Sequence, residues 1–256
     1  MAVESRGRSR FGSVSSRPTS AQAAAVATCI FCDRPAGSVE YLWPEWLCRH
    51  FTDTFVAPSH SADVALLERM RQEVDQTIDR ICSSCMYGWI QHLDDDVIAF
   101  FPPMISGDRT RLSPRQQAVL ARWAAKTATI MECASGGAVP PPRGVGLHLP
   151  HSGVAAGTQV LLGRYDGEAR VLSHDRDRFH RTIGGTERHV PQSTFVIGKV
   201  FLQVFADPWR DSPPEPADDI ADLLVALVPV HHRKVDWPPT KSIDDWNYDR
   251  ARYGPA

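Results

Sequence analysis

The sequence predicts an α+β protein, in which a cysteine-containing module is followed by one long helix and then by a small mixed β-sheet region. Three observations lead to this prediction. Two C-x2-C pairs lie in the first third of the chain, a capped amphipathic segment follows them, and strand-like runs begin after about residue 144. Helical and strand-forming stretches that are segregated along the chain are typical of α+β folds.

The composition is that of a folded protein. The chain has 256 residues, of which 43% are hydrophobic and 23% charged, so it can bury a sizeable core. Its formal net charge of −2 gives no global positive field for nucleic acid. No apolar run approaches the ~20 residues that span a bilayer, and no signal peptide is visible, so we expect no membrane association. The six cysteines are too few for a disulfide scaffold, which favours a cytoplasmic location.

Residues 1–27 are predicted to form a disordered basic tail. The segment is rich in Ser, Arg and Ala, and it carries four arginines against one glutamate with almost no large apolar side chains. A solvated tail is the favoured interpretation. The alternative is a basic arm that contacts nucleic-acid phosphates.

The two cysteine pairs are Cys29 with Cys32 and Cys82 with Cys85. Two pairs at this spacing indicate a site in which four thiolates hold Zn²⁺ tetrahedrally, and such a closed site is structural. Zinc binding of this kind supplies about 10–16 kcal/mol of apparent free energy toward folding. The alternatives are four small buried side chains or a redox dithiol, although the βαβ context of a dithiol motif is missing.

The segment between the pairs must hold structure of its own. Apolar residues from Val64 to Ile78 recur at helix spacing, but residues 75–81 are also compatible with a strand that enters the second pair. Apolar residues from Trp89 to Val97 predict a helix that begins at the second pair and places Cys85 in its first turn. Free amides and the helix dipole stabilise a thiolate at that position.

A long connecting helix is predicted over residues 113–137. Ser113 is the expected N-cap, Pro114 the first helical residue, and Gln116 the second partner of a capping box. Lys126 lies among apolar residues of this helix. We expect its ammonium to reach solvent, and a buried, paired lysine is the alternative.

The last part of the chain, residues 144–240, is predicted to be a mixed α/β region. Two strand-like runs, 160–165 and 169–173, flank Asp166-Gly167, which is a hairpin turn signal. The other predicted segments are a buried strand or short helix over 193–205, an amphipathic helix over 219–227, an extended stretch over 228–231, and an irregular tail over 241–256.

The residues around the two cysteine pairs resemble those of the HNH endonuclease-like treble-clef proteins. In that family a first C-x2-C leads into E/D-H-hydrophobic-x-P, often followed by x-W-L, and a second pair opens a helix as C-x-x-C-N-x-G-W. The matching residues here are Cys29, Cys32, Glu40, Pro44, Trp46, Leu47, Cys82, Cys85, Gly88 and Trp89. The resemblance implies a treble-clef (ββα-type) zinc module within residues 28–112. It does not extend to the chain after residue 144.

The resemblance also implies where a nuclease centre would lie, and the departures from the family pattern fall there. Active relatives use the histidine after the acidic residue as a general base, whereas this chain has Tyr41, whose pKa of about 10 makes it a poor base. Met86 replaces the family's asparagine, and a thioether is a poor ligand for Mg²⁺. Only Glu40 keeps its expected type, as a ligand of a catalytic Mg²⁺ or Mn²⁺.

We therefore expect an HNH-like zinc protein that is catalytically degenerate and binds DNA, RNA or a protein partner. The alternative is an active metal-dependent endonuclease that hydrolyses phosphodiesters with a non-standard base. Glu40 and His92 are the predicted catalytic pair in that case, and His50 is a second candidate for the base. The aspartates at 94–96 would bind a hard cation, or they form a solvated helix end beside an exposed His92. The aromatic residues that follow Glu40 are interpreted as core or as a stacking surface for bases: Tyr41, Trp43 and Trp46.

Overall fold

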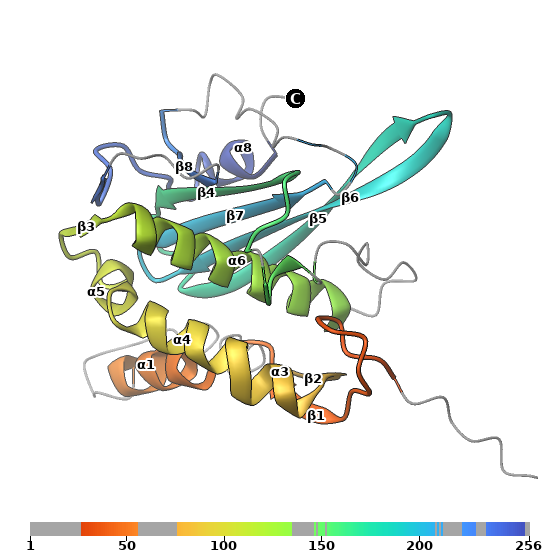
Figure 1. Ribbon diagram of the computed structural model, residues 1–256. Helices are drawn as coiled ribbons and strands as arrows, with labels where there is room; N and C mark the ends of the chain where they lie inside the picture. Colours follow the sequence, from red (N-terminus) through yellow and green to blue (C-terminus); the bar gives the residue numbers. More distant parts are fainter. Residues whose placement is uncertain are drawn as a thin grey trace, which may run out of the picture.

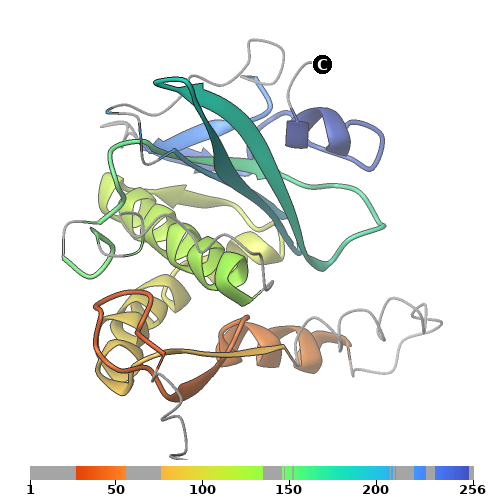
Figure 2. The ribbon, with the colours of Figure 1, turned by 90° about the vertical axis from the view of Figure 1, so that its right-hand side faces the viewer.

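The protein is built in three layers (Figures 1 and 2). The computed structural model describes residues 27–55, 76–134, 146, 148–151, 153–207, 209, 211, 222–228 and 234–253. A five-stranded antiparallel sheet forms one outer layer, and helix α6 (Pro114–Ala134) lies across one face of it. The other outer layer, on the far side of α6, contains helices α1 and α4 and a two-stranded sheet. Mixed helices and strands confirm the predicted α+β class.

The elements of the cysteine-containing layer come first in the chain. They are β1 (Ser38–Tyr41), α1 (Glu45–Phe55), β2 (Thr77–Ile81), α3 (Ser83–Cys85), the π-helical turn η1 (Met86–Ile90), α4 (Gln91–Ile98) and α5 (Phe101–Ile105). The large sheet consists of β4 (Thr158–Arg164), β5 (Leu172–Ile183), β6 (Thr186–Ile197), β7 (Val200–Ala206) and β8 (Val225–Val228). The remaining elements are β3 (Thr110–Leu112), β9 (Val235–Trp237) and α8 (Tyr248–Tyr253).

Strand β2 leads directly into the second cysteine pair. It pairs antiparallel with β1, with Glu40 opposite Ile78. The strand alternative for residues 75–81 is therefore confirmed over β2, because backbone pairing with β1 outweighs the helical spacing of the side chains. The rest of the predicted helix after Ser61 lies outside the described residues, as does the predicted tail up to residue 26.

The helix predicted at the second pair is present, but it is not regular. It begins as α3, passes through η1 and continues as α4. Gly88 has φ −102° and ψ −111°, which are not helical values, and this distortion marks the kink within η1. The periodic side chains Ile90, Leu93 and Val97 are buried as expected.

Helix α6 begins as predicted. The backbone N–H of Gln116 donates to the Ser113 hydroxyl at 3.3 Å, and the Ser113 N–H donates to Gln116 Oε1 at 2.9 Å. This reciprocal pair is a capping box, with Gln116 at its third position. Buried residues occur on almost every side of α6, because the sheet packs on one side of the helix and α4 on the other.

The hairpin predicted around Asp166-Gly167 is wrong. Strand β4 pairs with β7 and β8, and β5 pairs with β6, so the sheet order is β5-β6-β7-β4-β8. The segment after β4 is instead a loop that binds a distant carboxylate. Asp245 accepts a hydrogen bond from the Tyr165 hydroxyl and from the backbone N–H groups of Glu168, at 2.9 Å, and Ala169, at 3.1 Å.

The tight turns of the sheet lie elsewhere. Gly184 and Gly185 have positive φ angles of 56° and 77°, and they join β5 to β6. Residues 193–205 are not one strand or a helix, because Gly198, at φ 56°, starts a turn between β6 and β7. A Cβ at Gly198 would lie 2.5 Å from the Ile105 carbonyl oxygen, so only glycine fits there.

Two further predictions concern the last part of the chain, and the structure corrects the first of them. Residues 225–227 form part of strand β8 rather than a helix, because they pair with β4 and extend the sheet. The stretch over 228–231 is confirmed as extended only at Val228, since residues 229–231 lie outside the described part.

The tail over 241–256 is not irregular throughout, since it contains α8. This helix packs Tyr248 and Ala251 on the second face of the sheet, against Val196 and Phe201. Sheet side chains alternate between α8 on one face and α6 on the other.

The core is continuous across the layers. One cluster of buried side chains runs from Cys29 to Trp237 and includes residues of both outer layers. Strand β3, which follows the cysteine-containing layer, pairs with β9 near the end of the chain. Among the described residues, no helix combines the length and the apolar character needed to cross a membrane.

A half-buried histidine within the sheet is expected to make the stability of the protein depend on pH. His174 in β5 stacks on Phe195, with ring centroids 5.0 Å apart, and its Nε2 lies 3.2 Å from the Ser193 hydroxyl. Burial lowers the pKa of His174 to about 4. The unfolded chain, with a histidine pKa of about 6.5, therefore binds a proton at a higher pH than the folded protein does.

This shift predicts a loss of stability as the pH falls from about 6.5 to about 4. Above this pH window the neutral His174 makes its full contribution to the free energy of unfolding. About 3 kcal/mol of that free energy is lost as the pH falls through the window. We expect His174→Gln to be least stable relative to wild type at pH 7, with the difference shrinking toward pH 4.5. Urea unfolding at both pH values measures this, with the exposed-histidine variant His92→Gln as control. An unchanged difference for His174→Gln would contradict the assignment.

Candidate metal centre and its surroundings

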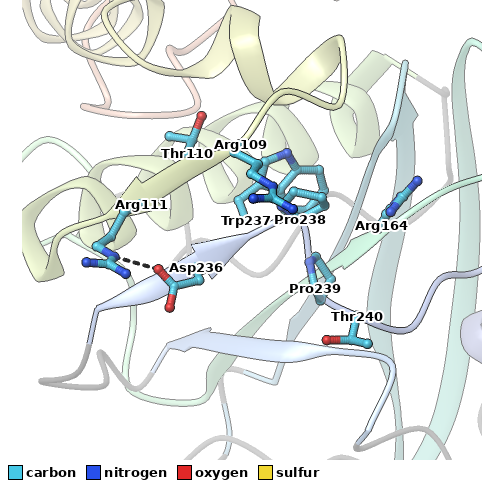
Figure 3. A pocket seen from close by; sticks show the side chains of 9 residues that line it. All are labelled: Arg109, Thr110, Arg111, Arg164, Asp236, Trp237, Pro238, Pro239 and Thr240. Atoms are coloured by element: carbon cyan, nitrogen blue, oxygen red, sulfur yellow. Dashed lines mark hydrogen bonds and ion pairs between the residues drawn. The ribbon is translucent and has the colours of Figure 1, made fainter.

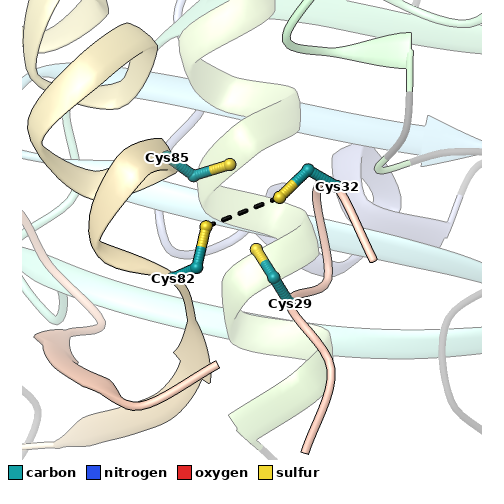
Figure 4. A group of neighbouring side chains, drawn as sticks. All are labelled: Cys29, Cys32, Cys82 and Cys85. Atoms are coloured by element: carbon teal, nitrogen blue, oxygen red, sulfur yellow. Dashed lines mark hydrogen bonds between the residues drawn. The ribbon is translucent and has the colours of Figure 1, made fainter. Parts of the chain in front are cut away.

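Four cysteine thiols converge at one end of the cysteine-containing layer (Figure 4). The sulfur atoms of Cys29, Cys32, Cys82 and Cys85 all lie within 4.8 Å of one another, and those of Cys32 and Cys82 are 3.5 Å apart. A tetrahedron with metal–sulfur bonds of ~2.3 Å has sulfur–sulfur distances of about 3.8 Å. All four cysteines are free of disulfides, and together they could hold a metal ion such as zinc.

The first pair sits in a tight loop that backbone hydrogen bonds close. The N–H of Cys29 donates to the Arg34 carbonyl at 2.7 Å, and the N–H of Asp33 donates back to the Cys29 carbonyl at 3.3 Å. Asp33 has a φ of 56°, which aspartate tolerates better than most residues. The N–H of Ile30 donates to the Arg80 carbonyl at 3.0 Å, so this loop is attached to the strand that carries the second pair.

The second pair lies at the transition from strand to helix. Cys82 has extended backbone angles and is the N-cap of α3, and its carbonyl accepts the N–H groups of Cys85 and Met86, each at 3.0 Å. Cys85 is therefore in the first helical turn, as predicted. Because Cys82 and Cys85 are both buried, a cation between them is screened little by water.

The electrostatic surroundings of the thiols differ. Burial raises the pKa of Cys29 and, more strongly, that of Cys85. Burial acts in the same direction on Cys32, but the backbone N–H of Arg34 and the neighbouring thiols donate to its sulfur and lower its pKa to about 7. A bound dication would favour the thiolate form of all four side chains.

Trp89 joins the two cysteine pairs through packing. Its ring meets the ring of Phe31, from the first pair, edge to face with centroids 5.0 Å apart. The Arg122 guanidinium of α6 lies 5.2 Å from the Trp89 ring on another side. The indole N–H has no hydrogen bond of normal geometry in the described structure, but its interaction with Cys85 opposes the rise in that thiol's pKa. The tryptophan of the family motif therefore packs around the cluster.

Glu40 points into the protein. The exposure of β1 alternates, so Glu40 is half-buried while Val39 and Tyr41 are exposed. Burial raises the pKa of the Glu40 carboxyl, the Lys126 ammonium acts to lower it, and the Asp94 carboxylate acts to raise it. The interior neighbours of Glu40 are therefore a lysine and an aspartate, and no histidine contributes to this shift.

Lys126 is buried and paired, so the expectation that its ammonium reaches solvent is wrong. Only 2% of its side chain is exposed, and its Nζ lies 2.9 Å from Asp94 Oδ1. The same oxygen accepts the indole N–H of Trp123 at 2.8 Å. The Lys126 side chain of α6 binds Asp94 of α4 where these two helices pack together. Asp94 therefore forms a buried link between two layers.

The predicted catalytic histidine lies on the surface. His92 is on the exposed side of α4, and no interaction of its side chain with Glu40 is found in the described structure. His50 lies in α1 and stacks edge to face on Phe51, with centroids 5.5 Å apart. Within the described residues, the four cysteines are the one group of three or more His, Cys, Asp or Glu side chains that could share a metal ion.

The aromatic residues after Glu40 separate into two kinds. Trp43 is fully buried and meets Phe195 of the sheet edge to face, and Trp46 packs against Phe101 and Trp123. Trp43 is therefore a core residue, and Trp46 is a partly buried residue packed against the core. Tyr41 is 49% exposed.

Sequence reasoning assigned no role to the Asp94–Lys126 pair as such. A signal was present, because Lys126 and Trp123 are three residues apart on a helix that is otherwise rich in Ala and Thr. The sequence does not predict which carboxylate pairs with Lys126. Asp94 is one of three consecutive aspartates, and only the packing of α4 on α6 selects it. Glu132, also on α6, is buried and binds Arg178 of β5 at 2.6 Å.

Comparisons with known proteins found nothing similar. Family models, curated proteins and solved structures all lack a match to this chain.

Proposed function

We propose that this protein is a catalytically degenerate HNH-like module that is held together by structural zinc and binds nucleic acid. The observations that carry the proposal are the four-cysteine cluster and the pairing of Lys126 with Asp94, two residues that both act on the carboxyl of Glu40. The zinc site supports the fold, and the lysine occupies the region where catalysis would need a metal ion.

Zinc is the metal that suits the cluster best. Four thiolates at tetrahedral separations are soft ligands, and they exclude Mg²⁺ and Ca²⁺, which prefer oxygen. A loop bearing the first pair, two paired strands and a helix that starts at the second pair support our proposal of a treble-clef arrangement. A closed site of this type leaves no position for a reacting water.

The region around Glu40 supports a non-catalytic protein. An ammonium group that is 2% exposed supplies the positive charge for Asp94 and acts on the carboxyl of Glu40. A divalent cation placed between these carboxylates would meet the charge of Lys126 and be repelled. Tyr41, at the position of the general base, lies on the opposite side of the strand from Glu40.

Nucleic-acid binding is supported by a projecting hairpin. Strands β5 and β6 each have 12 residues, but β6 pairs with β7 only from Gln192 to Ile197. The remaining residues, 178–191, form a two-stranded ribbon that extends beyond the sheet, which we call the β5–β6 arm (Figure 1). At ~3.4 Å per residue its six or so residue pairs reach about 20 Å. A two-stranded ribbon of this kind fits the major groove of a DNA duplex.

The composition of the arm suits phosphates. Apart from Arg178, which binds Glu132 of α6, it carries two arginines against one glutamate in a chain whose net charge is −2. The exposed Arg188 guanidinium lies 5.6 Å from the centroid of the Trp209 ring, and 38% of Trp209 is exposed. An arginine beside an exposed aromatic ring combines phosphate contact with a stacking surface for a base.

We expect the double variant Arg188→Gln, Trp209→Ala to bind nucleic acid about tenfold more weakly than wild type or worse, because it loses a phosphate contact and a stacking partner. Fluorescence anisotropy with labelled duplex and single-stranded DNA and RNA measures this at two salt concentrations. Arg115→Gln, an exposed arginine at the start of α6, is the matched control. Equal affinities for the double variant and the control would contradict the role of the arm.

The same preparations test catalysis. With Mg²⁺ or Mn²⁺, plasmid DNA and RNA should remain intact for both wild type and Glu40→Gln. Metal-dependent cutting that disappears in Glu40→Gln would instead establish the endonuclease alternative.

A further inference from the structure

A pocket lies where the β3–β9 pair meets the end of β4 (Figure 3). Its volume is about 610 Å³, which is within the range of small-ligand sites. The residues that line it are Arg109, Thr110, Arg111, Arg164, Asp236, Trp237, Pro238, Pro239 and Thr240. They come from three segments that are far apart in the sequence, so only the folded chain creates this pocket.

The lining has a surplus of positive charge. It contains three guanidinium groups and one carboxylate. Arg111 Nε binds Asp236 Oδ1 at 2.5 Å, and Arg164 Nε binds Asp166 at 3.0 Å. Arg109 is exposed and makes no ion pair with any described residue. Within the described part of the chain, one guanidinium is therefore uncommitted, and the two paired ones retain further N–H donors.

Besides the arginines, the lining includes an aromatic ring and two hydroxyl groups. Trp237 is only 2% exposed and its indole nitrogen is buried, so it contributes part of the wall and no accessible donor. Thr110 and Thr240 add hydroxyl groups to the same pocket.

We infer that this pocket binds a phosphate group. Guanidinium forks match the oxygens of phosphate in pairs, and charge-assisted bonds of this kind are about twice as strong as neutral ones. A phosphate group has three terminal oxygens to accept from Arg109 and from the N–H groups that Arg111 and Arg164 retain, whereas a carboxylate has two. The donors available are guanidinium and hydroxyl groups, and phosphate oxygens accept from both.

The pocket is separate from the proposed nucleic-acid contact. Strand β3 and the tip of the β5–β6 arm lie at opposite ends of the protein in Figure 1. The phosphate could belong to a small phosphorylated molecule or to a nucleic-acid strand, and the test must separate these two sources. The inference does not depend on the proposed function, because free phosphate can bind whether or not the arm contacts nucleic acid.

The test uses the full chain and two probes. Isothermal titration with inorganic phosphate represents the small-molecule source, and anisotropy with a labelled 20-nucleotide single strand represents the other. We expect Arg109→Gln and Arg164→Gln to weaken binding of the same probe, either phosphate or the oligonucleotide, by about tenfold or more. Each variant removes a charge-assisted bond to a phosphate oxygen. Arg115→Gln, outside the pocket, should match wild type. Arg109→Gln loses no described ion pair, so it should fold normally, and a thermal melt checks this.

Each outcome decides the inference. Loss of inorganic phosphate binding in the two variants supports a site for a small phosphorylated molecule. Loss of oligonucleotide binding alone, with the β5–β6 arm intact, supports a strand phosphate in the pocket. If both variants bind both probes as Arg115→Gln does, the pocket is not a phosphate site. If the arm variant Arg188→Gln, Trp209→Ala binds nucleic acid as well as its control does, the proposed function is rejected. If the pocket variants still lose phosphate binding in that case, the phosphate site remains supported.

Discussion

Replacing Cys85 with serine is expected to release the metal and unfold the cysteine-containing layer. Cys85 is 3% exposed and lies within 4.8 Å of the other three sulfurs. A four-thiolate zinc site contributes roughly 10–16 kcal/mol of apparent binding free energy, more than the whole stability of most domains. Since the core of this layer is continuous with that of the sheet, the loss should spread to the whole protein.

Elemental analysis and thermal melts measure the effect. Wild type should contain about one zinc per chain, because one closed four-thiolate site holds one ion. A strong chelator should reproduce the effect of Cys85→Ser. Cys133→Ser is the matched control, since Cys133 lies outside the cluster, and it should keep its zinc. A fully folded protein without metal would reject the structural role of the cluster.

Breaking the buried Asp94–Lys126 pair is expected to have the second largest effect. Asp94→Ala leaves an ammonium group that is 2% exposed without its carboxylate, and such a loss costs about 3–5 kcal/mol. It also leaves the Trp123 indole N–H without its acceptor. Lys126→Met should cost less, because 17% of the Asp94 side chain is exposed and Trp123 still donates to it.

Urea unfolding of four variants separates these contributions. The double variant Asp94→Leu, Lys126→Met removes both charges and should recover much of the stability that Asp94→Ala loses. Asp95→Ala, the exposed neighbour on the same helix, is the control and should change stability by less than about 0.5 kcal/mol. If Asp94→Ala costs no more than Asp95→Ala, the pair is not a buried link between the layers.

The features that the sequence predicted correctly are local ones. The capping box of α6 depends on Ser113 and Gln116, which are three residues apart, so no distant part of the chain affects it. The two cysteine pairs predicted the cluster because C-x2-C spacing fits a tight loop or a first helical turn. Strand β2 was an open alternative, and the structure decided it through pairing with β1.

Most of the failed predictions concern contacts between distant segments. Asp166-Gly167 has the composition of a hairpin turn, but Asp245, almost 80 residues later, binds the backbone at Glu168 and Ala169 and holds a loop there. Tyr248 and Arg252 in the supposedly irregular tail form a helix because Asp175 and Asp177 of β5 bind them. No periodicity in the tail shows that those carboxylates are there.

The candidate site divides in the same way. The residue types and spacing of the four cysteines were enough to predict which side chains gather, because the two pairs are each ordered by their own backbone. The surroundings of Glu40 were decided only by the tertiary structure. Lys126 becomes a buried cation because α6 is enclosed between the sheet and α4, and the ammonium then needs Asp94 as its partner. Burial of a charge depends on what packs around it, and that is not a property of the local sequence.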